Sequence, residues 1–382
     1  VSKRIAGHIN NWLMAVEDYE HPENERRYRS ERNPPFALEF RYDRWRELER
    51  DLQKILSMCA PSAPKTVEAY LARITIEKRL RGARARLLEY PRQLPGQLPV
   101  AWTKMMAAAL LPRERQRREG LLGPSSCFDS ITSFHDAGIR DEIRFTDSSP
   151  HQLGWDQLFA KDANVALAMM HRLEMRAAVF WRNREVRYEG RRPRALVIVL
   201  GDQELKLWGD ETVYRWSRAI LGPHSLGSAY LALDNWLQEQ LEDKASLAEL
   251  LPRILQNNGL VATTSPIINA VAHRQNDRPS ISAIAPLLAA PRLWDYDIRR
   301  HMDDRYPTHR ISGLGSGRHH LEATEEIWKR YNNRGPFHHQ LLLAFHLMAD
   351  QEAQAFLQER RIRWTLGDLA DFEHELMNEA WR

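Results

Sequence analysis

The fold class is decided by residues 36–60, which have the sequence FALEFRYDRWRELERDLQKILSMCA. Apolar side chains recur there at intervals of three and four residues, at Trp45, Leu48, Leu52, Ile55 and Leu56. Because an α-helix has about 3.6 residues per turn, this spacing puts the five side chains on one face. We expect an amphipathic helix over 36–60 that packs this stripe against other helices and turns its charged face to solvent.

Helical patterns continue on both sides of this stretch. Residues 2–16 carry apolar side chains at helical spacing, and residues 67–90 do the same in spite of Gly82. The three prolines within 91–99 fix the backbone and remove hydrogen-bond donors. We therefore expect an ordered turn or extended connection there, followed by a short, mostly buried helix over 102–111.

The second half of the chain contains one strong strand signal. Residues 195–200 are apolar and rich in β-branched side chains, Gly201 and Asp202 favour a turn, and apolar residues return over 205–208. This pattern predicts one short β-hairpin near 195–208.

Helices are expected on both sides of this hairpin. Residues 120–154 lose the helical period and gain Ser, Asp, Gly and Pro, so they predict a long irregular connection, and residues 155–182 predict a helix. Ser246 and Glu249 have the spacing of a capping box, which supports a helix that begins near Leu247. After residue 210 the pattern predicts helices over 211–221, 225–242, 247–256, 264–274, 280–290, 292–303, 321–332, 337–358 and 366–380.

Together these elements predict a mainly α-helical protein made of irregular stacked helical hairpins, solenoid-like or bundle-like. Paired short helices form such stacks because each pair buries its apolar stripe against its neighbours. We expect four segments: an N-terminal helical segment with a basic stretch (1–120), an irregular connection (121–154), a helix plus the β-hairpin (155–222) and a helical, repeat-like domain (223–382).

The composition is typical of a globular protein, with 43% hydrophobic and 28% charged residues. No apolar run approaches the roughly 18 residues that a membrane-spanning helix needs, so we expect no membrane partner. Cys59 and Cys127 are the only cysteines, which excludes a disulfide framework and a four-cysteine zinc site. No secretory pattern opens the chain, and we expect a cytoplasmic location.

Positive charge is concentrated between Arg79 and Arg118. This stretch holds ten Lys or Arg residues against Glu89 and Glu114, a local net charge of +8, whereas the whole chain carries only +4. Such a stretch could neutralise phosphates of a nucleic acid. The candidate contacts are Arg79, Arg84, Arg86, Arg113, Arg115, Arg117 and Arg118. A solvated helix face is the alternative, because arginine is abundant throughout the chain.

Signatures of catalysis are weak. The glycine-rich residues 311–318 lack the lysine and the preceding strand of a phosphate-binding P-loop, so they predict a linker between helices. Cys127 has His135 and His151 not far along the chain, as a thiol nucleophile with an imidazole base requires. Because neither an oxyanion donor nor a third, orienting residue can be identified, we assign no catalytic, cofactor-binding or metal-binding residue.

Two further groups of residues have both a structural and a functional interpretation. Histidines are metal ligands elsewhere, but the late histidines here match neither H-E-x-x-H nor a Cys/His zinc spacing. They are His301, His309, His319, His320, His338, His339 and His346. Four tryptophans could stack on nucleic-acid bases, although their spacing is more typical of a core. They are Trp208, Trp216, Trp236 and Trp294.

Three stretches around the predicted hairpin, 204–210, 214–216 and 229–237, resemble a passage in large, poorly characterised bacterial ATP-binding proteins. Residues 67–98, with the motif GARARLLEYP at 82–91, are similar to the same group. The resemblance implies a P-loop NTPase module elsewhere in a longer polypeptide, and some members of the group look like components of antiphage defence. It implies no catalytic role for any residue of this chain.

The sequence thus predicts a non-catalytic α-helical scaffold or sensor region of a larger ATP-binding protein. Its expected partner is another protein or the rest of a larger polypeptide, and ATP would bind elsewhere. The start at Val1 without methionine agrees with a piece of a longer chain. The alternatives are a nucleic-acid-binding module that uses 79–118 and a stand-alone hydrolase that uses Cys127 or the late histidines.

Overall fold

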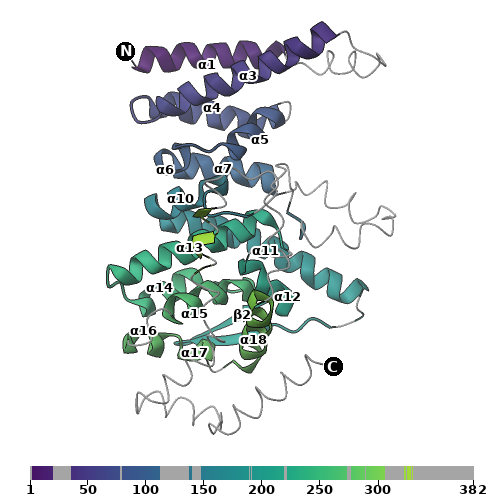
Figure 1. The fold of residues 1–382 in the computed structure, drawn as a ribbon, viewed down its shortest axis with the longest axis vertical. Coiled ribbons are helices and arrows are strands. Elements are labelled where there is room, and N and C mark those ends of the chain that lie inside the picture. The colour runs from purple at the N-terminus through teal and green to yellow at the C-terminus, as the bar shows by residue number, and fades with distance from the viewer. Residues whose placement is uncertain are drawn as a thin grey trace.

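A computed structural model describes most of the chain between Ser2 and Arg305. The described residues are 2–19, 36–77, 80–111, 137–139, 148–188, 190, 192–218, 222–272, 277–288, 290–305, 322–323, 325–327 and 329. They form a mainly α-helical structure with a single two-stranded antiparallel sheet. The helices stack in layers along the longest axis, with the N-terminus at one end (Figure 1). The predicted fold class is confirmed.

The described N-terminal layers are made of helices that range in length from 4 to 23 residues. They are α1 (Ser2–Tyr19), α3 (Phe36–Met58), α4 (Pro64–Ile76), α5 (Arg81–Glu89), α6 (Leu94–Gln97) and α7 (Pro99–Leu110). Pro64 and Pro99 each occupy the start of a helix, where a missing N–H costs no hydrogen bond. Helix α1 contacts α3 and α4, and α4 contacts α5 and α7, so each layer buries its apolar side chains against the next.

The single helix predicted over 67–90 is wrong, because the structure contains two helices there, α4 and α5. The chain leaves the helix at Glu77, which has an extended backbone. The guanidinium of Arg84 donates from Nη1 to the carbonyl oxygen of Ile74, 3.3 Å away. This bond gives a partner to one of the carbonyls that every helix leaves open at its C-terminus.

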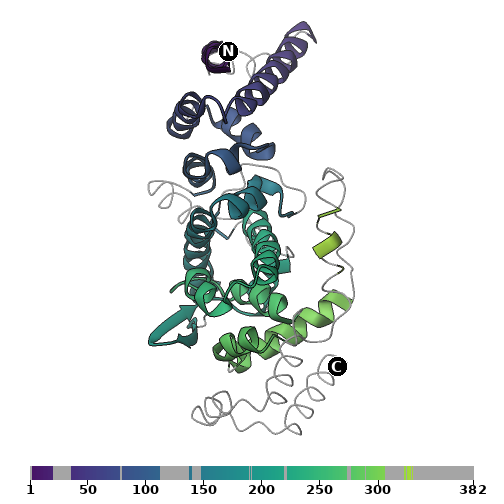
Figure 2. The ribbon, with the colours of Figure 1, turned by 90° about the vertical axis from the view of Figure 1, so that its left-hand side faces the viewer.

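The remaining helices form the larger part of the described structure (Figure 2). They are α10 (Trp155–Lys161), α11 (Ala163–Tyr188), α12 (Glu211–Tyr214), α13 (His224–Glu242), α14 (Leu247–Ile254), α15 (Thr264–Ala272), α16 (Arg278–Ala283), α17 (Ala285–Leu288) and α18 (Pro291–Arg305), with 3₁₀ turns η2 (Gln152–Gly154), η3 (Arg215–Arg218) and η4 (Val261–Thr263). Helix α13 contacts α10, α11 and α15, and all nine residues of α15 are buried.

Three predicted helices in this part are interrupted. The helix expected over 155–182 breaks at Asp162, whose Oδ1 accepts a hydrogen bond from the N–H of Val165 at 3.1 Å and so caps the second helix. The helix expected over 211–221 continues as a 3₁₀ turn after Tyr214, and the one over 280–290 divides into α16 and α17. The helices expected over 337–358 and 366–380 lie outside the described residues. Of the helix expected over 321–332, residues 322–323, 325–327 and 329 are described, and all of them are helical.

The predicted start of α14 at Leu247 is confirmed, but the capping box is not formed. The side chain of Ser246 makes no capping hydrogen bond. Its backbone carbonyl accepts from the N–H groups of Glu249 and Leu250, at 3.1 and 3.2 Å. The amphipathic stripe of this helix, rather than its cap, therefore determines where it packs.

The β-hairpin is confirmed. Strand β1 (Leu196–Leu200) pairs antiparallel with β2 (Gln203–Leu207), with Leu200 opposite Gln203 and Leu196 opposite Leu207. Gly201 has a φ of 56°, as the first position of a two-residue hairpin turn requires. The chain beyond β2 is held by a second segment, because Trp208 forms a parallel bridge with Leu260.

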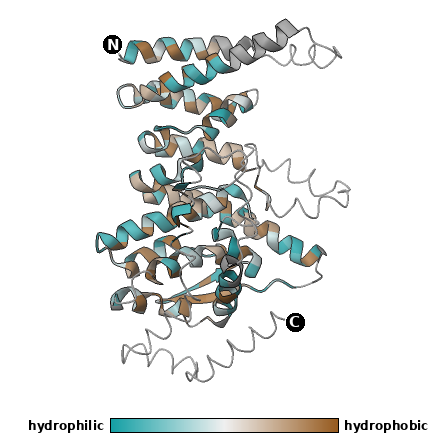
Figure 3. Ribbon diagram, viewed as in Figure 1, coloured by the Kyte–Doolittle hydropathy of each residue, from teal (hydrophilic) through white to brown (hydrophobic). Residues whose placement is uncertain are grey.

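The core interpretation of the tryptophans is confirmed for Trp216, Trp236 and Trp294, which are buried. Trp208 is half-buried, and the guanidinium of Arg182 lies 4.1 Å from its ring centroid. Hydrophobic residues are interspersed along most helices (Figure 3). No helix within the described ranges is both long and apolar enough to cross a membrane.

Candidate functional site

The predicted nucleic-acid contacts divide into described and undescribed residues. Arg84 and Arg86 lie on α5. Arg84 is buried against the end of α4, and Arg86 forms an ion pair with Glu49 of α3. Both guanidinium groups are therefore engaged in helix packing. The other five candidates lie outside the described residues, namely Arg79, Arg113, Arg115, Arg117 and Arg118.

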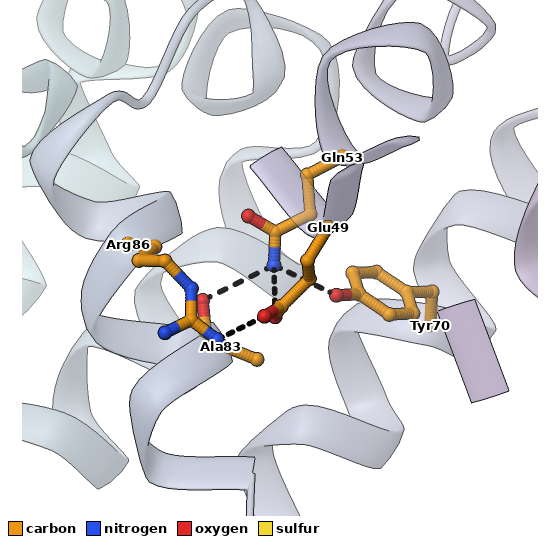
Figure 4. Close-up of polar contacts among 5 residues, drawn as sticks. All are labelled: Glu49, Gln53, Tyr70, Ala83 and Arg86. Atoms are coloured by element: carbon orange, nitrogen blue, oxygen red, sulfur yellow. Dashed lines mark hydrogen bonds and ion pairs between the residues drawn. The ribbon is translucent and has the colours of Figure 1, made fainter. Parts of the chain in front are cut away.

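A buried polar cluster joins α3, α4 and α5, which we call the Glu49 cluster (Figure 4). Glu49 is 0% exposed. The amide nitrogen of Gln53 lies 3.2 Å from Glu49 Oε1, 3.0 Å from the hydroxyl of Tyr70 and 3.3 Å from the carbonyl oxygen of Ala83. Because an amide has two N–H donors, these three acceptors share them. With Arg86 on the carboxylate, the cluster ties three helices together.

This cluster corrects the predicted orientation of α3. The sequence placed Leu48 and Ile55 on the packed stripe, but both are exposed, while Glu49 and Gln53 are buried. Leu52 and Leu56 are buried as expected. A carboxylate is buried only when its charge is compensated, and Arg86 supplies that compensation from 37 residues along the chain. No periodicity within 36–60 could have shown this partner.

A second buried carboxylate, Glu174 of α11, lies among hydroxyl groups, and we call this the Glu174 cluster. Glu174 is 1% exposed, and its Oε1 accepts from the hydroxyl of Tyr230 at 2.9 Å and from the hydroxyl of Thr263. His171 Nδ1 lies 3.6 Å from Oε2. Burial and the neighbouring Glu174 charge hold the pKa of Tyr230 well above its usual value, so this phenol stays a donor.

A third cluster joins α12 to α18. The hydroxyl of Tyr214 donates to Asp297 Oδ1 at 3.2 Å, and Arg300 Nε donates to the same oxygen at 2.8 Å. Asp297 and Arg300 are both buried. Burial, and then the Asp297 charge, raise the pKa of Tyr214 well above its ordinary value. The described ionisable groups of this cluster thus stabilise one another.

Residues 148–154 connect the N-terminal layers to the larger part of the structure. The backbone is left-handed at Leu153 and Gly154, with φ values of 58° and 69°. Trp102 of α7 donates from Nε1 to the Leu153 carbonyl at 2.9 Å, and the N–H of Ser149 donates to Ser228 of α13 at 3.1 Å. Strained backbone persists only where its surroundings fix it, as these contacts do here.

The same segment contains the described part of the hydrolase alternative. His151 Nδ1 lies 2.8 Å from Asp156 Oδ2, and this hydrogen bond raises the pKa of His151. Another imidazole, that of His224, lies 3.3 Å from the hydroxyl of Ser148. In a nucleophilic relay, a single imidazole contacts both the hydroxyl and the carboxylate. Here the carboxylate contacts His151 and the hydroxyl contacts His224. Cys127, and with it His135, lies outside the described residues.

Of the seven late histidines considered as metal ligands, one is among the described residues. His301 is buried on α18, and the other six lie outside the described residues. Within the described ranges, no group of three or more His, Cys, Asp or Glu side chains could hold a metal ion.

The N-terminal helices expose apolar side chains. Ile5 and Trp12 of α1 are exposed, Trp12 by 57%, although the sequence placed both on the packed stripe. Leu48 and Ile55 of α3 are exposed in the same way. In each pair the residues are seven apart, which places them on one face of the helix. We call these four side chains the N-terminal apolar surface.

Comparison with known proteins adds no relative. Protein-family models give no match to this chain, and no curated protein matches it. The function must therefore be argued from the residues themselves.

Proposed function

We propose that the chain is a non-catalytic α-helical scaffold that binds a protein partner, within a larger bacterial ATP-binding protein. The observation that carries this proposal is the exposure of Trp12 beside Ile5 on α1. Tryptophan side chains are mostly buried in folded proteins, so a ring exposed by more than half is uncommon. Tryptophan is also enriched among the residues that dominate protein–protein binding.

The described clusters support a structural rather than a chemical role. The Glu49 cluster, the Glu174 cluster and the Tyr214–Asp297–Arg300 contacts each join different helices from inside the packing. Groups held in this way stabilise the fold, and a substrate could reach them only if helices moved apart. We expect ATP to bind in another part of the polypeptide, as the sequence resemblance to large ATP-binding proteins implies.

Site-specific crosslinking tests the scaffold proposal. The chain is produced in its own cells with Trp12 replaced by the photo-crosslinker p-benzoylphenylalanine, and a matched chain carries it at Asn11. Asn11 is also exposed but faces a different direction, because successive residues on a helix do not share a face. We expect one partner of constant identity from position 12 and none from position 11.

The partner so identified is then titrated against the purified chain. We expect Trp12→Ala to weaken its binding by about tenfold or more, since truncation of an interface tryptophan removes a large buried area. Equal crosslinking from positions 11 and 12, or no loss of affinity in Trp12→Ala, would refute the proposal.

A further inference from the structure

Strand β1 has an open edge. One of its edges pairs with β2, and the other pairs with no strand among the described residues. In a hairpin with a two-residue turn, the pair that closes the turn is hydrogen-bonded and the pairs alternate from there. Leu200, Ile198 and Leu196 therefore bond to β2, and the N–H and C=O groups of Val197 and Val199 point away from it.

The hairpin lies at the surface of the molecule (Figure 2). Figure 2 shows the hairpin, in teal, at the periphery of the helical layers. One face of β1 is already covered, because α17 contacts it and Leu196 and Ile198 are buried. Val197 on the opposite face is 48% exposed. Proteins normally protect an edge strand with charged residues or proline, and β1 contains neither.

The sequence of β1 is the same in both directions, Leu-Val-Ile-Val-Leu. If two copies pair antiparallel about Ile198, Val197 of one copy lies opposite Val199 of the other. These are the residues whose backbone groups point outward, so the hydrogen bonds of both copies are satisfied in this register. If the register shifted by one residue, residues whose N–H and C=O groups point outward in one copy would lie opposite residues whose groups point towards β2 in the other, and these hydrogen bonds could not form.

The flanking charges favour the same register. Counting outward from Ile198, Arg194 lies four residues before it and Asp202 four residues after it. Because Gly201 and Asp202 form the turn that closes the hairpin, this pairing brings Arg194 of each copy near the turn of the other, which carries Asp202, and both side chains are exposed. Opposite charges brought close together across an interface favour association, whereas like charges oppose it.

We propose that the chain forms a two-fold symmetric dimer through β1, in which two hairpins make one four-stranded antiparallel sheet. The second copy is the favoured occupant because strand sequence, backbone direction and flanking charge are all self-complementary about one residue. An interface of this kind is isologous, so it closes at two copies. This inference is independent of the proposed function.

Sedimentation equilibrium of the purified chain tests the proposal. We expect a monomer–dimer equilibrium without larger species, and Val197→Pro should raise the dissociation constant about tenfold or more. Proline removes an N–H that points away from β2, so the hairpin keeps its own hydrogen bonds. Val197→Thr is the matched control, because it keeps both the N–H and the β-branch, and should stay within about twofold of the parent.

A charge exchange provides a second test that does not depend on proline. Arg194→Asp and Asp202→Arg should each raise the dissociation constant about fivefold, because each brings like charges near one another at both ends of the paired strands. The double exchange restores both pairs and should return to within about twofold of the parent. A monomer at all concentrations, an open series of larger oligomers, or a dimer insensitive to both the proline and the charge variants would overturn the proposal.

Discussion

Two buried glutamates in different parts of the molecule are stabilised in different ways. Glu49 in the N-terminal layers faces the guanidinium of Arg86 and the amide of Gln53, whereas Glu174 of α11 faces the hydroxyls of Tyr230 and Thr263. One carboxylate is compensated by a formal opposite charge and the other mainly by hydroxyl dipoles. The first arrangement should therefore depend strongly on charge, and the second on hydrogen-bonding capacity.

The faces of the helices differ between the same two regions. In the larger part of the structure, α15 is buried on every residue and α13 on most of them. In the N-terminal layers, α3 buries polar residues and exposes Leu48 and Ile55. Both regions bury an apolar core, but of the exposed large apolar side chains among the described residues eight lie in the N-terminal layers and four in the larger part. This excess is why we place the partner surface on α1 and α3.

Removal of the Glu49 carboxylate should have the largest effect. Glu49→Ala removes the buried ion pair with Arg86 and one acceptor of Gln53, so we expect a loss of about 3 kcal/mol in the free energy of unfolding. Urea denaturation followed by circular dichroism measures this loss. Glu204→Ala is the control, because its contact with Lys206 is exposed at 3.8 Å, and should cost about 0.5 kcal/mol or less. Equal losses in the two variants would contradict the assigned role of Glu49.

The connection between the two regions should be nearly as sensitive. A Cβ at Gly154 would lie 2.2 Å from Pro95 Cγ, and the φ of 69° already disfavours a side chain. We expect Gly154→Ala to cost about 2 to 3 kcal/mol. Gly190→Ala is the matched control, because Gly190 has a φ of 61° with open space around it, and should cost about 1 kcal/mol. If denaturation gave equal losses, the close contact with Pro95 would not be what constrains Gly154.

The comparison of the two carboxylates is sharpened by glutamine. Glu174→Gln keeps an oxygen that accepts from both hydroxyls, and its new N–H can turn towards His171 Nδ1, so we expect a loss of about 1 kcal/mol or less. Glu49→Gln removes the charge that Arg86 needs, so we expect about 2 kcal/mol. Urea denaturation of both variants in one buffer gives the two losses in the free energy of unfolding, which can then be compared. A larger loss in Glu174→Gln would show that charge, not hydrogen bonding, dominates at Glu174.

The sequence predicted the elements better than their orientation. The hairpin was predictable because β-branched residues and Gly201–Asp202 are local signals, and the helices because hydrophobic periodicity is local too. The breaks at Glu77 and Asp162 were missed, although Asp162 is a recognisable N-cap residue.

The two buried carboxylates were not predictable from periodicity. Glu49 depends on Arg86, 37 residues away, and Glu174 on Thr263, 89 residues away. Hydrophobic periodicity describes one helix at a time, so it cannot reveal a polar residue whose burial depends on a distant partner. The predicted stripe of α3 was wrong at Leu48 and Ile55 for this reason, and their exposure is its consequence.

The smallest expected effect concerns His151, whose pair with Asp156 is partly exposed and lies at the connection between the two regions. The hydrogen bond to Asp156 raises the pKa of His151 in the folded state. The pair therefore contributes fully below the unfolded pKa of 6.5 and loses this contribution as the pH rises through the higher folded pKa. We expect about 0.5 kcal/mol or less, because solvent screens the pair.

The difference in unfolding free energy between the parent and His151→Gln isolates this contribution from other titrating groups. It should be larger near about pH 5.5 than near about pH 8.5, because the imidazole is charged only at the lower value. His224→Gln serves as control, since it leaves the His151–Asp156 pair in place and so keeps the pH-dependent part. A parent–variant difference that stayed constant, or grew with pH, would mean that the charged imidazole does not stabilise the connection, and that contacts such as those of Trp102 and Ser149 hold it without this charge.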